Sequence, residues 1–109
     1  MTDRLQSNFL ENVVAGTHAA FNVSEGRIFK PKLIVITNLN AVDQLITLEV
    51  DGDTVYPRIE MDGESTLMLH EEDLLGLTIT DDGLDIVTAL DDVDIYVAGV
   101  EIGAGRNRP

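Results

Sequence analysis

Hydrophobic and polar residues alternate along most of the chain with a period of two, which is the pattern of β-strands that bury one face. Within residues 44–50, for example, Ile46, Leu48 and Val50 share one face, whereas Thr47 and Glu49 share the other. Further alternating runs follow at residues 54–61, 65–70, 75–79, 84–89 and 93–97. Helical spacing is nearly absent, so the pattern predicts an all-β protein.

Short segments rich in Asp and Gly separate these runs, at residues 51–53, 62–64 and 81–83. An Asp-Gly pair supplies the positive φ angle that tight hairpins require. Strands with turn signals every eight to twelve residues are typical of sandwiches and barrels. We therefore expect an antiparallel β-sandwich of the jelly-roll or immunoglobulin-like type, with roughly eight short strands joined as a meander. The length of 109 residues suits one domain, spanning residues 1–109.

Three places interrupt the alternation. Pro57 cannot donate a hydrogen bond to a neighbouring strand, so its strand is expected at an edge or with a bulge. Gly99 predicts a bulge in the last strand. Residues 71–75 could form a helical turn or a corner, and we expect the corner.

The N-terminal third contains one strand that is apolar on both faces, Leu33–Thr37 within the run from Arg27 to Thr37. Such a strand is expected to be covered on both sides. One face should meet the core, and the other a neighbouring subunit or the N-terminal segment. Before it, residues 12–15 and 17–23 predict two short strands around Gly16, and residues 5–10 suit either a helix or a strand.

The charge of the chain is strongly acidic and unevenly distributed. There are 7 Lys and Arg against 20 Asp and Glu, for a net charge of −13. Residues 1–32 carry four bases and three acids, whereas residues 33–105 carry 17 acids and Arg58 alone. Such a body repels itself at ordinary ionic strength, and molar salt shortens the screening length to about 3 Å. The excess of Asp over Glu and the two lysines resemble proteins from high-salt environments.

Several classes of partner and site are disfavoured by composition. Nucleic acid binding needs clustered Lys and Arg, which this acidic body lacks. No apolar run reaches the ~20 residues of a membrane helix, and the first ten residues do not resemble a secretion signal. The absence of cysteine excludes disulfides and thiolate chemistry. We expect no nucleic acid, no membrane and no cofactor, and synthesis in a cytoplasm.

Catalytic and metal-binding motifs are also missing. His18 and His70 have no partner pattern, and no phosphate-binding loop or nucleophile elbow occurs, so we expect no enzyme and no catalytic residue. Asp81, Asp82 and Asp85 are the weak candidates for a calcium site, because clustered loop carboxylates can converge on a hard cation. The simpler interpretation is that they are solvated turn residues.

Four segments follow one another along the chain: Ala15-Gly16-Thr17, residues 23–27, residues 33–38 and Val97-Ala98-Gly99-Val100-Glu101-Ile102. Their order resembles that in small β-sandwich proteins of tailed bacteriophages and archaeal viruses. Ser24 stands where that group often has proline. The resemblance implies a virion structural protein, such as a head decoration or turret protein, a neck protein or a tail component. With the acidic composition, it points to a virus of haloarchaea and a location in the virion, exposed to a high-salt medium.

The expected function is therefore non-enzymatic: a homo-oligomer, trimer or pentamer, that docks on a larger capsid or tail protein. The docking segment is expected at residues 1–16, and residues 103–109 are expected to form a flexible basic tail. The surplus of apolar residues, 44% of the chain, supports burial between subunits. The expected interface residues are Leu5, Phe9, Leu10, Val13, Phe21, Leu33, Ile34, Val35 and Ile36. The alternative is a glycan- or ligand-binding module of a cell-surface or secreted protein, reading its ligand with loops 38–43 and 71–76.

Overall fold

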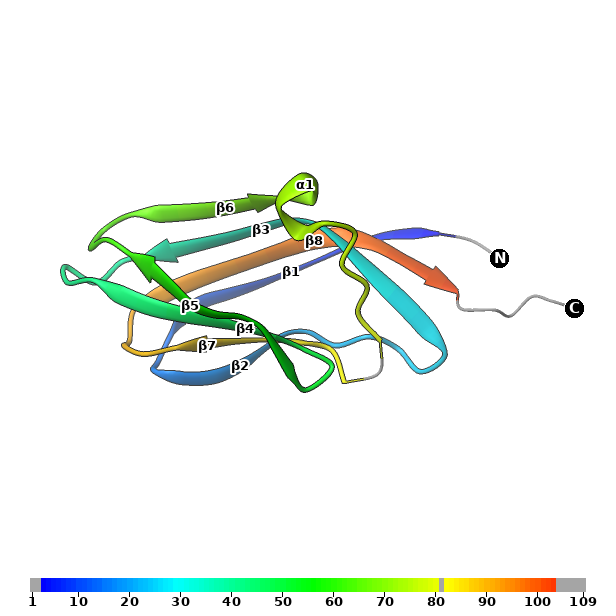
Figure 1. Ribbon diagram of the computed structural model, residues 1–109, viewed down its shortest axis with the longest axis horizontal. Coiled ribbons are helices and arrows are strands. Elements are labelled where there is room, and N and C mark those ends of the chain that lie inside the picture. Colours follow the sequence, from blue (N-terminus) through cyan, green and yellow to red (C-terminus); the bar gives the residue numbers. More distant parts are fainter. Residues whose placement is uncertain (1–2, 81, 104–109) are drawn as a thin grey trace, which may run out of the picture.

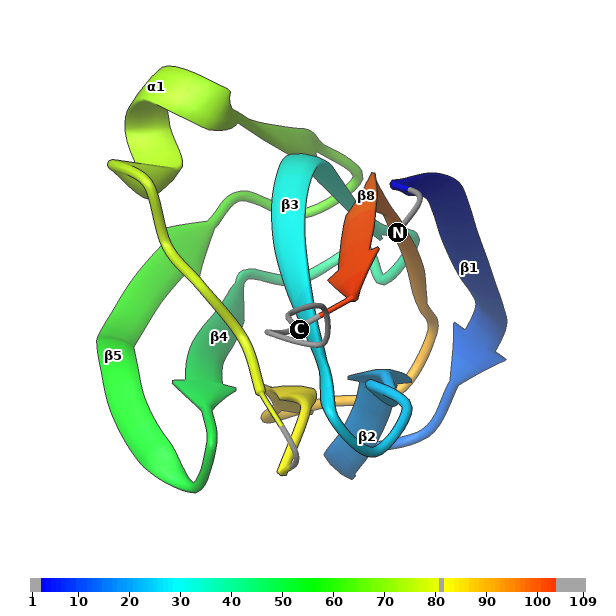
Figure 2. The same cartoon turned by 90° about the vertical axis from the view of Figure 1, so that its right-hand side faces the viewer.

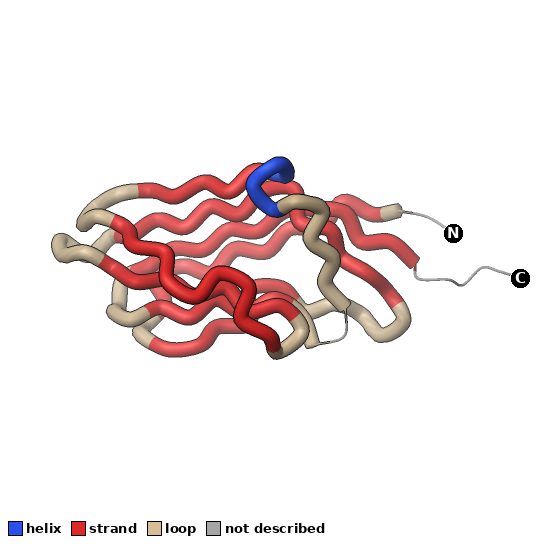
Figure 3. Tube along the Cα trace, in the orientation of Figure 1, coloured by secondary structure: helices blue, strands red, loops and turns tan. Residues whose placement is uncertain are grey.

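The computed structural model describes residues 3–80 and 82–103, which form two four-stranded antiparallel sheets packed face to face (Figures 1 and 3). Sheet A contains, in spatial order, β1 (Arg4–Val13), β8 (Val93–Gly103), β3 (Arg27–Asn38) and β6 (Thr66–His70). Sheet B contains β2 (Gly16–Phe21), β7 (Leu84–Thr88), β4 (Gln44–Val50) and β5 (Asp53–Met61). Figure 2 shows the sandwich from the end at which β1 begins and β8 ends.

The connections between strands identify the fold. Only β4 and β5 are both consecutive in sequence and in the same sheet, whereas every other connection in the described chain passes from one sheet to the other. Eight strands wound in this way into two sheets form a jelly roll. The prediction of an all-β antiparallel sandwich is confirmed, and of the two sandwich types considered, the jelly roll is the one observed.

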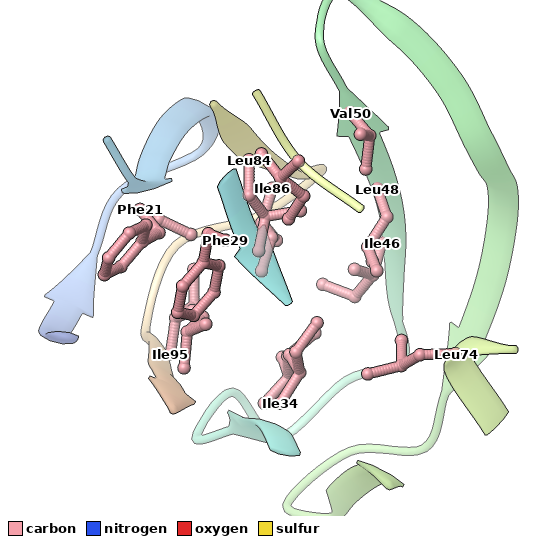
Figure 4. Close-up of a cluster of buried hydrophobic side chains, with 14 of the residues drawn as sticks. Phe21, Phe29, Ile34, Ile46, Leu48, Val50, Leu74, Leu84, Ile86 and Ile95 are labelled. Carbon is pink, nitrogen blue, oxygen red and sulfur yellow. The ribbon is translucent and has the colours of Figure 1, made fainter. Parts of the chain in front are cut away.

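The core fills the space between the two sheets and follows from the period-two alternation. Along β8, every second residue from Val93 to Val97 is buried, and the same holds for β4 from Gln44 to Val50. The rings of Phe21 and Phe29 stack with their centroids 3.8 Å apart. Figure 4 shows both rings among the buried aliphatic side chains of the two sheets.

The predicted meander is wrong, because turns recognised in the sequence do not all join neighbouring strands. The turn at residues 51–53 does form the β4–β5 hairpin. The turn at residues 62–64 instead carries the chain from β5 in sheet B to β6 in sheet A. A turn signal shows where a strand ends, but long-range packing decides which sheet the next strand joins.

The segment after β6 also differs from the expectation. Residues 71–74 form a helical turn, α1 (Glu71–Leu74), rather than the corner we expected. Residues 75–79 form no strand, although Ile79 makes an isolated bridge to Phe29. Leu75 and Gly76 both adopt positive φ angles, of 50° and 73°, which interrupt an extended strand.

Pro57 lies where the sequence predicted, in the edge strand of sheet B and at a bulge. Ile46 pairs with Ile59 and Leu48 with Tyr56, so β5 has one extra residue around Pro57. The bulge shifts the alternation of β5, so that Tyr56 packs against the core and Val55 is exposed. Simple alternation over residues 54–61 places Val55 on the inner face together with Ile59 and Met61, and the bulge makes this prediction wrong for Val55.

Gly99 adjoins a bulge that lies in the partner strand. Pro31 pairs with Gly99 and Leu33 with Ala98, so the extra residue, Lys32, belongs to β3. Near the N-terminus, residues 5–10 are strand residues within β1. Residues 12–15 form no separate strand, because β1 extends to Val13 and β2 begins at Gly16.

The proposed docking segment, residues 1–16, contains β1, an edge strand of sheet A. Of the proposed tail, Gly103 ends β8, and residues 104–109 lie outside the described residues.

Candidate assembly surface

The outer face of sheet A carries apolar side chains in rows that cross all four strands. Residues paired directly in antiparallel strands project from the same face of the sheet. Phe9 pairs with Tyr96, Tyr96 with Val35, and Val35 with Met68, so these four side chains form one row. The neighbouring row consists of Ser7, Ala98, Leu33 and His70.

Much of this surface is accessible in the single chain. Leu5 is 88% exposed, Phe9 54% and Met68 50%, while Leu33, Val35 and Tyr96 are partly buried. Leu5 pairs with Val100, which extends the apolar surface beyond the row of Ser7. Contiguous exposed apolar surface of this kind marks interaction sites in soluble proteins. We call this surface the sheet A face, and its apolar members are Leu5, Phe9, Leu33, Val35, Met68, Tyr96, Ala98 and Val100.

A hollow of about 330 Å³ interrupts the sheet A face over β1 and β8. Its walls include Leu5 and Tyr96, and between them lie the small side chains of Ser7 and Ala98. Lys32 borders the hollow from β3. The face therefore carries both a depression, where the small side chains lie, and a projecting ring, Phe9, two residues farther along β1.

Charges on the sheet A face are confined to its two ends. Lys30 pairs with Val100 at one end, where Lys32 also lies, and the Nζ of Lys32 donates a hydrogen bond to Glu71 at 2.6 Å. Asp94 pairs with Thr37 at the other end and accepts a hydrogen bond from the backbone N–H of Asn12 at 2.7 Å. The apolar rows thus separate a basic end from an acidic end.

The outer face of sheet B has a different character. Ala19 pairs with Asp85, and Asp85 with Glu49, which pairs in turn with Thr54. This row across all four strands contains two carboxylates and no large apolar side chain. The neighbouring row, Thr17, Val87 and Thr47, carries no charge, and Leu45 is partly exposed farther along β4, so sheet B carries an acidic row rather than a wholly acidic face.

A buried carboxylate, that of Glu101, connects β8 to the N-terminal strand. Its side chain is 3% exposed and lies against Arg4, with the Nε of Arg27 at 3.3 Å. Burial by itself raises the pKa of Glu101. The hydrogen bonds from Arg4 and from the Ser24 N–H, together with the charges of the Arg4 and Arg27 guanidinium groups, outweigh burial, so the pKa of Glu101 is lowered below its usual value. Glu101 was not among the predicted site residues, although alternation from Val93 places it on the inner face.

The predicted interface residues divide into three groups in the structure. Leu5, Phe9, Leu33 and Val35 belong to the sheet A face, as described above. Leu10 and Val13 are partly buried and pack against the core. Phe21, Ile34 and Ile36 are buried in the core of the chain itself, so their assignment to an interface with another molecule is wrong. Figure 4 shows Phe21 and Ile34 there.

The candidate metal ligands do not form a cluster in the described part of the chain. Asp82 is an exposed turn residue and Asp85 lies in β7, while Asp81 lies outside the described residues. Among residues 3–80 and 82–103, no three carboxylates or imidazoles are grouped so that they could hold a metal ion. His18 contacts the carbonyl of Val14, and His70 lies 3.8 Å from Asp73.

The loop at residues 38–43, one of the two candidate ligand loops, is held by its own hydrogen bonds. The buried side chain of Asn38 donates to the carbonyls of Val42 and Asp62 and accepts from the N–H of Asn40. Asn38 therefore orders the loop from inside.

Over the described ranges, no helix is long and apolar enough to span a membrane.

Comparison with known proteins gives similarity of fold without similarity of sequence. No protein-family model and no curated protein sequence matches this chain. The coat protein of Tobacco streak virus is similar in structure, with a TM-score of 0.52, 14% identity, and coverage of 98% of this chain and 89% of that one. The Drosophila NLP core, a pentamer studied for histone binding, has a TM-score of 0.50, 12% identity, and coverage of 94% and 99%. These similarities agree with the strand order in assigning the chain to the jelly-roll fold.

Proposed function

We propose that this chain is a non-enzymatic structural protein of a virion, which assembles with copies of itself and docks on a larger capsid or tail protein. The observation that carries the proposal is the sheet A face, where exposed Leu5, Phe9 and Met68 lie on a chain that is otherwise strongly acidic. An exposed apolar surface of this extent is typical of a site that another protein covers.

Two further observations support a virion as the setting. The coat protein of Tobacco streak virus has the same architecture over nearly the whole chain, and jelly rolls are common in viral capsids. The order of sequence motifs resembles that of small virion proteins of tailed viruses. We further propose that the chain assembles as a trimer or pentamer and that it docks through residues 1–16. We also propose that the virion belongs to a haloarchaeal virus and is exposed to a high-salt medium. The protein would be made in the host cytoplasm.

A second candidate function is binding of a basic protein. The acidic row on sheet B, with Asp85 and Glu49, offers charge complementarity to such a partner, and the Drosophila NLP core has a similar fold. Electrostatic binding of this kind weakens steeply as salt is added. Titration with histones at 0.1 M and 1 M salt, with Asp85→Lys as the variant, tests it.

The experiment for the leading proposal follows the protein into particles. An antibody against the chain is used on particles banded in a density gradient from a culture that carries the gene. We expect the chain to band with the particles, and its presence only in the soluble fraction would overturn the proposal. The genes beside its own are expected to encode portal, capsid or tail proteins.

Point variants connect the particle experiment to the sheet A face. Deleting the first eleven residues would remove most of β1 from sheet A and so damage the fold itself. Phe9→Asp instead places a charge on the face without removing a strand. Leu45→Asp is the matched control, because Leu45 is a partly exposed residue that pairs with Glu60 on sheet B. We expect Phe9→Asp to lose incorporation into particles and Leu45→Asp to retain it.

A further inference from the structure

We infer that the sheet A face is covered by the same face of a second copy, related to the first by a twofold axis that runs across the strands. This inference rests on the proposed function in taking the face as an assembly surface. It adds the identity of the partner and the orientation in which it binds, and it predicts a dimer in place of the trimer or pentamer. A twofold interface requires one patch to be complementary to itself.

The shape of the face meets this requirement. A twofold axis in the plane of the interface, running across the strands, places each strand over the same strand of the second copy, with the two running in opposite directions. With the axis between the two apolar rows, the row of Phe9, Tyr96 and Val35 lies over the row of Ser7, Ala98 and Leu33 of the second copy. The projecting Phe9 ring then faces the hollow bordered by Leu5, Ser7 and Ala98, and the same fit occurs a second time by symmetry.

The charges at the two ends of the sheet A face also make it complementary to itself. The same rotation places the end that carries Lys30 over the end of the second copy that carries Asp94. β3 and β8 are neighbouring strands about 4.8 Å apart, a separation that a lysine side chain can span. An axis parallel to the strands would instead leave Lys30 opposite its own end of the face, where the carboxylate of Glu71 is already bonded to Lys32. The charge distribution therefore selects the orientation across the strands.

The area of the sheet A face determines how strongly we expect the two copies to bind. Four strands at about 4.8 Å spacing and about eight residues of length at 3.4 Å cover roughly 500 Å² per copy. The pair would bury about 1,000 Å², which is near the lower limit for a specific interface. Because each copy has a net charge of −13, we expect a reversible dimer that salt strengthens.

The experiment is sedimentation velocity on the purified full chain over a range of concentrations at 0.1 M and 2 M NaCl. We expect a monomer–dimer equilibrium. Phe9→Asp should weaken it by at least tenfold, and the control Leu45→Asp should leave it within twofold of wild type. A second variant, Ser7→Leu, fills the hollow while keeping Phe9, and should weaken dimerisation as well. Thermal melts of each variant establish that it remains folded.

Charge reversal tests the orientation separately. Lys30→Glu and Asp94→Lys should each weaken the dimer severalfold, and the double variant should recover most of the loss. Failure of the double variant to recover, with all three proteins folded, would overturn the orientation across the strands.

Other outcomes distinguish the partner from the function. A chain that stays monomeric at all concentrations, but bands with particles in a Phe9-dependent manner, would assign the face to a larger virion protein and overturn the second copy as its partner. A trimer or pentamer insensitive to Phe9→Asp would also overturn the inference. A Phe9-dependent dimer that is absent from particles would support the inference and overturn only the proposed function.

Discussion

Replacing Gly99 with alanine tests a close approach between the two central strands of sheet A, β8 and β3. Gly99 lies on β8 opposite Pro31 of β3, beside the bulge at Lys32. An added Cβ would lie 2.3 Å from the carbonyl oxygen of Lys30, 2.8 Å from the Cα of Pro31 and 2.8 Å from the Cζ of Phe29. Two of these three atoms belong to the backbone, so a change of rotamer cannot relieve the contact.

The magnitude follows from where the strain falls. Inserting an extra methyl group into a well-packed core costs about 1–3 kcal/mol. At Gly99 the strands themselves must move apart, and Phe29 is fully buried, so we expect the upper end, about 3 kcal/mol. For a domain of this size, 1 kcal/mol lowers Tm by about 4–8 °C, which gives a fall of roughly 12–24 °C.

Gly76→Ala is the matched control for this change. Gly76 has a φ of 73°, so alanine is strained there, but nothing lies within 4 Å of the added Cβ. The cost should be limited to the left-handed backbone, about 1–2 kcal/mol. Both variants and the wild type would be compared by thermal and urea unfolding in the same buffer. If Gly99→Ala melts as high as Gly76→Ala, the steric argument is refuted.

Three further predictions concern buried polar groups and charge. Because the folded pKa of Glu101 is lowered, its contribution to stability is present above the ordinary carboxyl pKa of 4.5 and is lost as pH falls through the folded pKa. Unfolding of Glu101→Gln should therefore depend less on pH than unfolding of the wild type in that acidic range, and an unchanged dependence would contradict the assignment. Asn38→Ala should cost about 2–3 kcal/mol, measured by urea unfolding, because the carbonyl of Val42 loses its donor and the N–H of Asn40 its acceptor, whereas the carbonyl of Asp62 keeps the Ser65 hydroxyl. Dilution from molar salt to 0.1 M lengthens screening to about 10 Å and should lower Tm, and a Tm that does not change with salt would refute the high-salt interpretation.

The local structure of most strands could be predicted from the sequence because alternation is a local property. The runs at residues 44–50, 84–89 and 93–97 correspond to β4, β7 and the beginning of β8. The run at residues 75–79 alternates equally well but forms no strand, since the positive φ angles of Leu75 and Gly76 interrupt it. Alternation therefore indicates which residues can share a face, but the chain direction before and after the run decides whether a strand forms.

The pairing of strands could not be predicted, because each sheet combines strands that are distant in sequence. β1 and β8 lie at opposite ends of the described chain and pair along most of β1. The ion pairs of Glu101 with Arg4 and Arg27 depend on this pairing and on the pairing of β8 with β3. No local pattern brings these three residues together. The buried carboxylate is therefore recognisable as a link between β8, β1 and β3 only in the folded chain.

The sheet A face shows how a local signal and a long-range one combine. The run Leu33–Ile36 is apolar on both sides, and this predicted that one side would enter the core without showing which one. All four residues were expected at the interface, whereas the side with Ile34 and Ile36 is the one buried in the core. The other side, with Leu33 and Val35, amounts to two partly buried residues when β3 is considered alone. It becomes an extended apolar surface because β8 adds Tyr96 and Ala98 beside it, and β1 adds Phe9 beyond them. The alternation of each strand provides the apolar side chains, and the jelly-roll strand order aligns them into rows that another protein can cover.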